Sequence, residues 1–380
     1  MKIVHIIIGL GRGGAEMVLT RLIKAHQANP DYEHVVISLT DMGCYGSQLV
    51  KIGVPVYALG LKNAFGLLRV FWLLVRRLRE LKPNVVQTWM YHADLLGGLA
   101  AKLAGEPPVI WGIHSVDLRR GTNRTTRVLQ KLCAWFSTWL PALILCVAEA
   151  SRRSHIAVGY DSGRMLVVPN GFDVEPTEIL PAEVAELRAR YGLRPENILV
   201  GCIGRFHPDK DHRNFVEAAV LLRAKYSLAR FMMVGAGLDA NNSALKSWIE
   251  AGHMSDHFIL LGERSDVPLC LCAIDVFCSS SRTEAFPLVV GEAMTLARPL
   301  VVTDVGDTAL LVGDTAIVVE RENPRALALG LSTLLDASVE QRKALGLRAQ
   351  TRVRREFSID QMISHTVSAY DYALQSKSKR

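Results

Sequence analysis

The chain has 380 residues, more than a single hydrophobic core usually supports, so two domains of similar size are expected. Hydrophobic residues make up 49% and charged residues 21%, which excludes a disordered chain. The net charge of +7 is concentrated in residues 1–175, with 20 Lys and Arg against 12 Asp and Glu. This excess suits anionic lipid, a phosphorylated acceptor or nucleic acid, but no aromatic-basic interleaving, zinc-finger spacing or RNA-binding motif favours nucleic acid.

The N-terminal segment Met1–Gly9 is a short apolar run that ends in a glycine loop, and it lacks the cleavage site of a signal peptide. It predicts a buried first strand. The seven cysteines are odd in number and include no CxxC pair, so neither a disulfide framework nor a zinc site is indicated. A cytoplasmic protein is expected.

Short apolar runs alternate with longer segments of helical period along the whole chain, which is typical of repeated βαβ units and parallel sheets. In the first half, the expected strands are Ile3–Ile8, His34–Leu39, Val54–Leu59, Val85–Thr88, Val109–Ile113, Ala142–Val147 and Met165–Pro169. Helices are expected to begin near Gly14, Cys44, Asn63, His92 and Asn123. A polar stretch through Thr177 and Pro181 then predicts a linker.

A second set of strands follows the linker: Ile198–Ile203, Arg230–Val234, Phe258–Leu261, Val276–Ser279, Leu300–Thr303 and Ala316–Val319. The fold class is therefore α/β, with two parallel-sheet domains joined near residue 175. Ligands of such sheets bind at the carboxyl ends of the strands. The site is expected between the two domains, and Ser376–Arg380 reads as a solvated tail.

A glycine loop, Gly9–Glu16, follows the first predicted strand and precedes an amphipathic run. Its amides could meet an anion at a helix N-terminus. The loop also matches the dinucleotide fingerprint through Gly9, Gly11 and Gly14, with Asp41 as the ribose acid, so an NAD-dependent oxidoreductase remains an alternative. A tight turn between strand and helix without any ligand is the less favoured alternative.

The loop Gly204–Asp211 occupies the corresponding place in the second half. Its cations Arg205 and Lys210, five residues apart, can hold both phosphates of a diphosphate and neutralise charge as it departs. The alternative is a solvated basic loop, which the glycine at the strand end makes less favoured.

The segment Ser280–Met294 is the most specific part of the sequence. Glu284 and Glu292 have seven residues between them, one on a loop and the other inside an apolar helix. Carboxylates accept paired hydrogen bonds from vicinal hydroxyls, which suits a hexose and a ribose. The alternative is that both glutamates are ordinary surface residues, but a carboxylate within an apolar helix requires a partner.

Together these segments resemble glycosyltransferase family 4, a retaining family with the GT-B fold, in the type that builds bacterial cell-surface polysaccharide. The resemblance extends over nearly the whole chain, with further matching segments at Val168–Asp173, Val234–Gly237, Leu261–Val267, Thr303–Gly306 and Arg354–Ser358. It implies two Rossmann-like domains facing a cleft: an acceptor-binding domain at 1–175, a nucleotide-sugar-binding domain at 176–356, and a C-terminal helix at 357–380 that packs on the first domain.

The resemblance also implies roles for individual residues. His114, Glu284, Arg205 and Lys210 would be catalytic, although a lone histidine at a strand end is more often structural. Glu292 would bind the ribose, Glu263 and Arg264 the base, and Glu284 the transferred sugar. The full set of implied donor-binding residues is Gly13, Gly14, Arg205, Lys210, Gly235, Glu263, Arg264, Val267, Glu284, Phe286, Pro287, Leu288 and Glu292, and the acceptor-binding residues are Glu16, Trp89 and His92.

Two positions depart from the family's commonest pattern, since Ala285 replaces a glycine and Pro287 has no N–H to donate to a sugar. No pair of carboxylates is placed to hold a cation, so no metal and no cofactor are expected. The implied reaction is transfer of a hexose or N-acetylhexosamine from a UDP-sugar, or another nucleoside diphosphate sugar, with retention of configuration.

The preferred acceptor is a lipid-linked saccharide used for cell-surface polysaccharide, O-antigen or exopolysaccharide. Phe65–Arg79 predicts an apolar helix that carries Arg69 and Arg76, and it could lie on the inner face of an anionic membrane. A core-facing helix with solvated arginines is equally compatible. Besides the oxidoreductase, a nucleotide-sugar 2-epimerase and a sugar-nucleotide sensor remain open.

Overall fold

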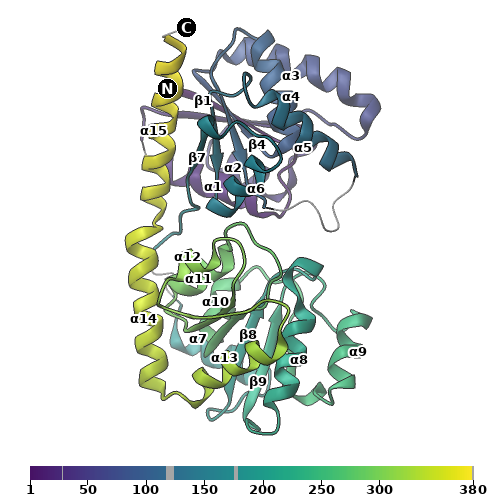
Figure 1. Ribbon diagram of the computed structural model, residues 1–380, viewed down its shortest axis with the longest axis vertical. Coiled ribbons are helices and arrows are strands. Elements are labelled where there is room, and N and C mark those ends of the chain that lie inside the picture. The colour runs from purple at the N-terminus through teal and green to yellow at the C-terminus, as the bar shows by residue number, and fades with distance from the viewer. Residues whose placement is uncertain (28, 117–123, 175–178, 379–380) are drawn as a thin grey trace. The chain divides into compact units, whose positions relative to one another are not determined.

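The computed structural model describes residues 1–27, 29–116, 124–174 and 179–378. The predicted helix start at Asn123, part of the predicted linker including Thr177, and the last two residues of the tail lie outside these ranges. The described chain divides into two compact units, Met1–Gly171 with Ile359–Arg380, and Phe172–Ser358 (Figure 1).

The first unit contains a seven-stranded parallel sheet in the order β3-β2-β1-β4-β5-β6-β7. The strands are β1 Lys2–Ile7, β2 Glu33–Ser38, β3 Val56–Ala58, β4 Val85–Trp89, β5 Val109–Ile113, β6 Leu143–Cys146 and β7 Met165–Val167. The helices are α1 Gly14–His26, α2 Gly43–Lys51, α3 Leu67–Leu81, α4 Tyr91–Leu103, α5 Arg124–Phe136, α6 Glu149–Ile156 and α15 Ile359–Ser378.

The second unit contains a six-stranded parallel sheet in the order β10-β9-β8-β11-β12-β13. Its strands are β8 Ile198–Ile203, β9 Ala229–Val234, β10 Phe258–Leu260, β11 Val276–Ser279, β12 Leu300–Thr303 and β13 Ile317–Val319. Its helices are α7 Pro181–Arg190, α8 His212–Leu222, α9 Ser243–Ala251, α10 Val267–Ala273, α11 Leu288–Thr295, α12 Thr308–Val312, α13 Pro324–Asp336 and α14 Val339–Glu356. The prediction of two parallel-sheet domains is confirmed.

The two sheets share a strand order that reverses in the middle, between β1 and β4 in the first unit and between β8 and β11 in the second. Ligands of open parallel sheets bind outside the carboxyl ends of the strands at such a reversal. The loops at these places are the ones that follow β1, β4, β8 and β11, and they include the three segments singled out in the sequence.

Each sheet is covered by helices on both faces and has a core of its own. The first core centres on fully buried residues such as Ile6, Leu74 and Trp111, and the second on Phe215 and Phe231. Helix α15 belongs to the first unit, where it packs on α1, β4 and β5, and its buried Tyr370 donates a hydrogen bond to Gln87 on β4 at 2.5 Å.

Candidate functional site

The loop after β8 holds its basic residues beside the end of β9, because glycines there let two backbones approach. Gly235 has φ +147, and a Cβ at this position would lie 2.1 Å from the carbonyl oxygen of Gly204. The amide of Phe206 then donates to the carbonyl of Ala236 at 2.7 Å. Arg205 is exposed on this loop, and Lys210 ends the short 3-10 turn that precedes α8.

Lys210 and Glu284 form an ion pair across the strand reversal of the second unit. Lys210 Nζ lies 2.5 Å from Glu284 Oε1, and the hydroxyl of Ser281 donates to the same oxygen at 2.7 Å. The two side chains keep 25% and 13% of their surface exposed, so a ligand can reach both. The structure therefore joins two of the four charged residues predicted for this site, from loops that are 74 residues apart in sequence.

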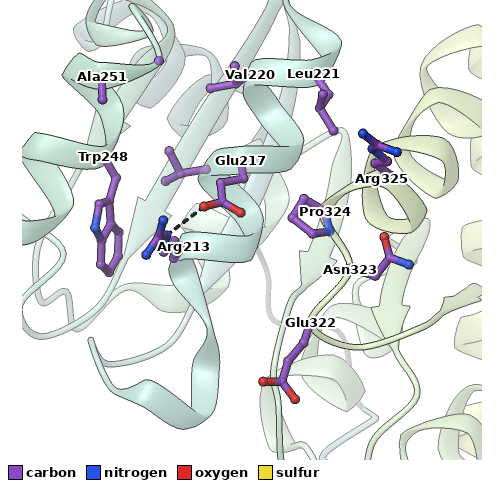
Figure 2. Close-up of a pocket in the computed structure, with 12 residues that line it drawn as sticks. Arg213, Glu217, Val220, Leu221, Trp248, Ala251, Glu322, Asn323, Pro324 and Arg325 are labelled. Atoms are coloured by element: carbon purple, nitrogen blue, oxygen red, sulfur yellow. Dashed lines mark hydrogen bonds and ion pairs between the residues drawn. The ribbon is translucent and has the colours of Figure 1, made fainter.

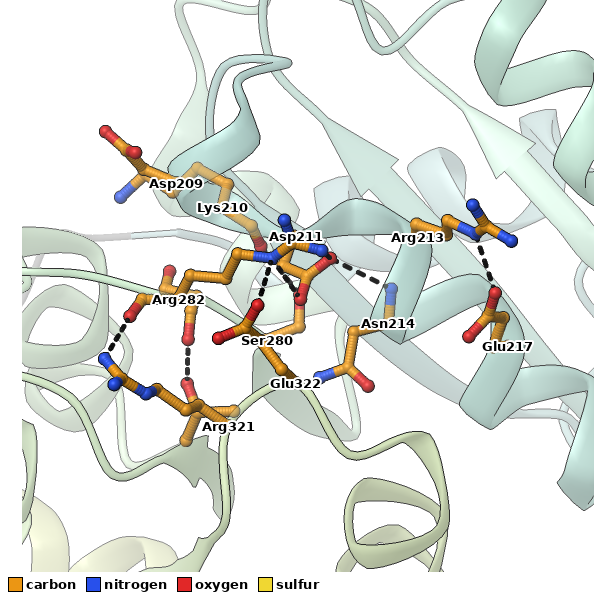
Figure 3. Close-up of polar contacts among 12 residues, drawn as sticks. Asp209, Lys210, Asp211, Arg213, Asn214, Glu217, Ser280, Arg282, Arg321 and Glu322 are labelled. Carbon is orange, nitrogen blue, oxygen red and sulfur yellow. Dashed lines mark hydrogen bonds and ion pairs between the residues drawn. The ribbon is translucent and has the colours of Figure 1, made fainter. Parts of the chain in front are cut away.

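A second ion pair, between Arg282 and Asp211, joins the same two loops (Figure 3). Arg282 Nε lies 2.8 Å from Asp211 Oδ2, and Arg282 Nη2 donates to Asp211 Oδ1 at 3.0 Å. Asp211 has only 3% of its side chain exposed, and its hydrogen bond raises the pKa of Arg282 above the usual value. Two further hydrogen bonds join these loops. The amide of Arg282 donates to the carbonyl of Asp209 at 2.7 Å, and the hydroxyl of Ser280 donates to the carbonyl of Lys210 at 2.9 Å.

The loop after β12 completes this support from the other side. Gly306 has φ +55, and a Cβ there would lie 2.0 Å from the carbonyl oxygen of Glu284. The amide of Asp307 donates to the carbonyl of Ala285 at 3.1 Å, and Thr303 Oγ1 donates to Ser281 O at 2.7 Å. The backbone that carries Glu284 is therefore held by β12 and its loop.

Glu292 lies on α11, which Phe286 and Pro287 connect to the Glu284 loop. Phe286 is 5% exposed and packs between the rings of Phe172 and Phe357, with ring centroids 6.1 and 5.6 Å away. Its side chain is thus part of the core. Glu292 is half-buried on this helix.

The segment at Gly262–Val267 lies next to Gly235, whose amide donates to Gly262 O at 2.7 Å. Arg264 donates two hydrogen bonds to the carboxylate of Asp266, at 2.7 and 2.5 Å. These bonds raise the pKa of Arg264 and lower that of Asp266. Glu263 is exposed, and Val267 begins α10. The predicted base-binding arginine therefore has a fixed orientation.

In the first unit, the glycine loop leads into α1. Gly13 is the residue before the helix, and a Cβ on it would lie 2.2 Å from a carboxylate oxygen of Glu16. The acidic side chain of Glu16 thus folds back over the helix N-terminus, and Gly13 leaves it room. Gly14 is the first helical residue and is exposed.

His114 follows β5 and stacks on Trp89 at the end of β4, with ring centroids 4.9 Å apart and an angle of 21° between the planes. The surrounding protein excludes water from most of the imidazole and lowers the pKa of His114 to about 3. Trp89 is 2% exposed, so its ring lies behind His114 and away from solvent. His92 is half-buried on the first turn of α4, and burial lowers its pKa.

Comparisons with known proteins decide the class. The family model described as Glycosyltransferase Family 4 matches residues 12–176, and the model described as Glycosyl transferases group 1 matches residues 197–337. Together they match most of the chain. It is a family 4 glycosyltransferase. The predicted family and enzyme class, a hexosyltransferase, are confirmed.

Similar proteins include two bacterial glycosyltransferases. This glycosyltransferase is 27% identical over 244 residues to the UDP-Gal:alpha-D-GlcNAc-diphosphoundecaprenol alpha-1,3-galactosyltransferase of Escherichia coli, a match that covers 63% of the chain and 62% of that relative. It is 24% identical to the putative glycosyltransferase EpsF of Bacillus subtilis (strain 168), over 80% of the chain and 79% of EpsF.

Among solved structures, Anabaena Alr3699/HepE in complex with UDP-glucose has a TM-score of 0.84 at 22% identity, over 97% of the chain and all of that structure. The predicted GT-B fold of the glycosyltransferase is therefore confirmed.

A groove in the second unit of the glycosyltransferase lies away from the predicted residues. It has a volume of about 640 Å³ and runs between α8, α9 and the start of α13 (Figure 2). Its floor is apolar, with Trp248 at one side, and the ion pair between Arg213 and Glu217 lies in its wall at 2.7 Å. None of the predicted donor or acceptor residues lines it.

The described part of the glycosyltransferase has no helix with the length and apolar character needed to cross a membrane. Within the same residues, no group of three or more histidine, cysteine, aspartate or glutamate side chains is placed to hold a metal ion.

Sequence reasoning missed three residues that shape the site of the glycosyltransferase: Ser281, Asp211 and Arg282. All three lie inside the two segments that it did single out. A signal existed for Asp211, because an aspartate immediately before an amphipathic run is a typical helix cap, and it does accept from Asn214 N at 3.4 Å. Nothing in the spacing indicated that Arg282 would pair with it.

Proposed function

We propose that this glycosyltransferase transfers a hexose or N-acetylhexosamine from a UDP-sugar to a lipid-linked saccharide, with retention of the anomeric configuration. The observation that carries the proposal is the Lys210–Glu284 pair with Ser281 at the strand reversal of the second unit. It combines a cation for phosphate and an acceptor for sugar hydroxyls within one hydrogen-bonded group. The similarity to a structure that binds UDP-glucose and to a UDP-galactose-dependent relative supports this donor class.

In the proposed complex, Lys210 and Arg205 bind the diphosphate. The ammonium group of Lys210 has three donors, so it can keep its contact with Glu284 and still donate to a phosphate oxygen. As the bond to the sugar breaks, negative charge grows on the diphosphate, and these fixed cations stabilise it. Gly13 and Gly14 at the start of α1 would approach the phosphates from the first domain.

The remainder of the donor would be held by carboxylates and backbone. Glu284 accepts from hydroxyls of the transferred sugar, with backbone around Phe286, Pro287 and Leu288 beside it, and Glu292 accepts from the ribose. The Arg264–Asp266 pair fixes the guanidinium plane of Arg264, so this plane can lie flat against the uracil ring, with Glu263, Val267 and Gly235 around it.

His114 would act as a neutral group beside the anomeric carbon. Its low pKa leaves the imidazole uncharged at neutral pH, so it can exchange hydrogen bonds with the sugar without repelling the positive charge that develops on the ring. The departing diphosphate would be stabilised by Arg205 and Lys210 in place of a metal. Turnover should therefore persist in EDTA; complete loss that Mn²⁺ or Mg²⁺ restores would contradict this part of the proposal.

The acceptor side would lie on the first domain, near Glu16 and His92, with Trp89 supporting His114 from behind. A lipid-linked acceptor is supported by the diphosphoundecaprenol substrate named for the Escherichia coli relative. Such an acceptor remains in the membrane, so the enzyme would work on the cytoplasmic face of an anionic bilayer.

Two helices of the first unit carry a surface suited to that bilayer. Helices α3 and α5 flank α4 (Figure 1), and part of the apolar side of α3, including Val70 and Leu74, packs into the core. The outer surfaces of α3 and α5, together with Phe65 just before α3 and Trp139 just after α5, nevertheless expose apolar residues, with Phe65 97%, Leu68 69%, Trp72 54%, Val128 59%, Leu132 43%, Trp135 69% and Trp139 44% exposed. Exposed cations lie among them: Arg69, Arg76, Arg127 and Lys131. Tryptophans among cations are typical of membrane-surface helices.

Vesicle flotation tests this surface. The protein should float with phosphatidylglycerol vesicles at low salt and less with phosphatidylcholine vesicles, because the cations need anionic lipid. The double substitution Trp72→Ser and Trp135→Ser should reduce flotation, whereas Leu329→Ser, at a site on the second unit that is 71% exposed, should not. Absence of the wild-type protein from floated phosphatidylglycerol vesicles at low salt would refute membrane contact.

A donor panel tests the reaction itself. The purified protein is incubated with UDP-glucose, UDP-galactose, UDP-N-acetylglucosamine, UDP-N-acetylgalactosamine and GDP-mannose, with and without a short-chain undecaprenyl diphosphate saccharide. We expect one UDP-sugar to be consumed faster with the acceptor and to yield an α-linked product. Acceptor-independent conversion into a second nucleotide sugar or free UDP would instead identify a 2-epimerase, and binding without consumption would identify a sensor.

A further inference from the structure

Trp89 stands out in the first unit because it connects His114 to a row of three buried histidines. The indole Nε1 donates to His5 Nδ1 at 3.3 Å, His5 Nε2 lies 2.9 Å from His34 Nδ1, and His34 Nε2 lies 3.1 Å from His26 Nδ1. These residues come from β4, β1, β2 and α1, and all are at most 6% exposed. We call Trp89, His5, His34 and His26 the histidine row.

The direction of every hydrogen bond in the histidine row follows from its first member. An indole N–H can only donate, so His5 Nδ1 must accept, and a neutral His5 then carries its proton on Nε2. That proton is donated to His34 Nδ1, which puts the proton of His34 on Nε2, and the same step repeats at His26. Burial keeps the row neutral, since it lowers the pKa of His5, His34 and His26.

The hydrogen bond from Trp89 to His5 fixes the plane of the indole, and the ring of His114 stacks on that plane. Trp89 packs against His114 at 4.9 Å, and no other ring stacks on His114 in the described chain. Gly112 lets β5 approach β4 closely, because a Cβ there would lie 2.9 Å from the carbonyl oxygen of Thr88, the residue before Trp89. Among the described residues, no hydrogen bond is made to either ring nitrogen of His114, so stacking is what orients the ring and leaves both nitrogens available.

The backbone at this place is strained, which is a second sign of a constrained site. Met90, directly after Trp89, has φ +70 and ψ 159, a conformation that only glycine adopts at low cost. Two backbone hydrogen bonds of 2.9 Å hold it, from Met90 N to Gly112 O and from Asp94 N to Met90 O. The turn therefore fixes the end of β4 against β5, where Trp89 meets His114.

We propose that Trp89 is a positioning residue, and that its hydrogen bond to His5 holds the indole in the plane on which His114 is oriented for glycosyl transfer. The inference rests on the proposed function for the role of His114. It assigns no substrate contact to Trp89 or to the histidines. Their effect on the reaction is exerted through the orientation of one neutral imidazole.

Two substitutions at His5 separate positioning from simple core packing. His5→Asn places a carbonyl oxygen where Nδ1 was, so it can still accept from Trp89 but cannot reach His34. His5→Gln places an amide where Nε2 was, so it can donate to His34 but leaves the indole N–H without an acceptor. Each variant loses one hydrogen bond of the row, so their melting temperatures should agree.

Two measurements distinguish the variants. Stacking under the indole should shift the Cε1 proton of His114 upfield in the NMR spectrum of the wild-type protein, and His5→Asn should keep this shift while His5→Gln loses it. With the UDP-sugar that the donor panel identifies, His5→Gln should lower kcat about tenfold or more, His5→Asn about twofold at most, and neither should change the donor KM. Any other pattern, such as equal kcat values or an unshifted His114 in both variants, overturns the proposal.

The spectroscopic measurement also keeps this inference separate from the proposed function. If the wild-type protein consumes none of the panel sugars, the proposed function fails, while the His114 shift still decides whether His5 controls the stack through Trp89. Long-range proton–nitrogen spectra add a check, because His5, His34 and His26 should all be neutral with the proton on Nε2 at pH 7. A proton on Nδ1 of His5 would exclude the row.

Discussion

At the strand reversal of the second unit, charged side chains face one another: Lys210 with Glu284, and Arg282 with Asp211. At the ends of β4 and β5 in the first unit, the groups in contact are the uncharged rings of Trp89 and His114. Both sets are held by contacts from several elements, but one presents charge and the other presents oriented neutral rings. The comparison shows that the same kind of parallel sheet can support either a network of ion pairs or a stack of neutral rings at the ends of its strands.

The largest expected effect comes from removing the cation. Lys210→Met should lower kcat/KM for the donor by roughly 100-fold to 1000-fold, because the departing diphosphate loses a fixed positive charge and Glu284 loses its partner. Steady-state kinetics measure it. The matched control is Lys225→Met, which removes an exposed lysine paired with Asp336 at 2.7 Å. Equal losses in both variants would mean that Lys210 has no special place in the reaction.

Acid should destabilise the first unit more than the second. Burial lowers the pKa of His34 and His155 to about 4 and that of His5 well below its usual value, whereas the second unit has one comparable buried histidine, His212, with a pKa of about 4. Below about pH 6.5 these histidines bind protons in the unfolded chain but stay neutral in the folded protein. The free energy of unfolding therefore falls as the pH drops from about 6.5 towards 4.

Each such histidine contributes a slope of about 1.4 kcal/mol per pH unit in that window and none above it. The titratable groups near the row are the N-terminal amine, Tyr32 and Tyr370, and burial raises the pKa of Tyr370 above its usual value. Urea unfolding followed by tryptophan fluorescence, which reports chiefly on the first unit, should show the steeper loss, and His34→Gln should reduce it. A flat profile between pH 7 and 5 would contradict neutral buried histidines.

A methyl group at Gly306 should disturb the sugar side of the site. Gly306→Ala places Cβ 2.0 Å from Glu284 O, so the Glu284 loop must move, and turnover should fall roughly 10-fold to 100-fold. Gly192→Ala has a similar φ of +67 with nothing within 4 Å, so it isolates the backbone cost of about 1 kcal/mol without touching the site. Comparable activity of the two variants would mean that Gly306 is not needed to hold the Glu284 loop in place.

The smallest effect is expected at the anchoring pair. Asp211→Asn keeps a side chain that can cap α8 and adopt φ +46, but it removes the charge that Arg282 contacts. The free energy of unfolding of the second unit should fall by about 1–3 kcal/mol, measured by urea titration, because a largely buried hydrogen bond to a charged group is weakened. Exposed Asp336→Asn serves as the control and should change it by less than about 1 kcal/mol.

The sequence predicted most of the fold because parallel strands are continuous apolar runs that stand out between helices, and the strands β1 to β13 lie close to their expected ranges. It also predicted which loops carry the charged residues and glycines, since a glycine or a charged residue follows the end of β1, β8 and β11 within three residues. The Lys210–Glu284 contact could be predicted from the sequence, because the two residues lie on loops that follow β8 and β11, which are neighbouring strands of one sheet.

The histidine row could not be predicted in this way. His5, His34 and Trp89 meet only because β1 lies between β2 and β4, an order that local sequence does not contain, and because the register pairs His5 with Val36 and with Gln87. The family resemblance implied that Trp89 contacts the acceptor. The side chain of Trp89 is instead buried, and the ring that stacks on it belongs to His114, which follows β5 and lies 25 residues later in the chain.

Helix α15 has a consequence for how the protein is made. The first unit contains residues from both ends of the chain, and Tyr370 of this last helix is fully buried against Gln87 of β4. Helix α15 leaves the ribosome only after every strand of both sheets has been synthesised. The half that is translated first is therefore the half that is completed last, and until then the flank of its sheet and of α1 that this helix covers is open to chaperones.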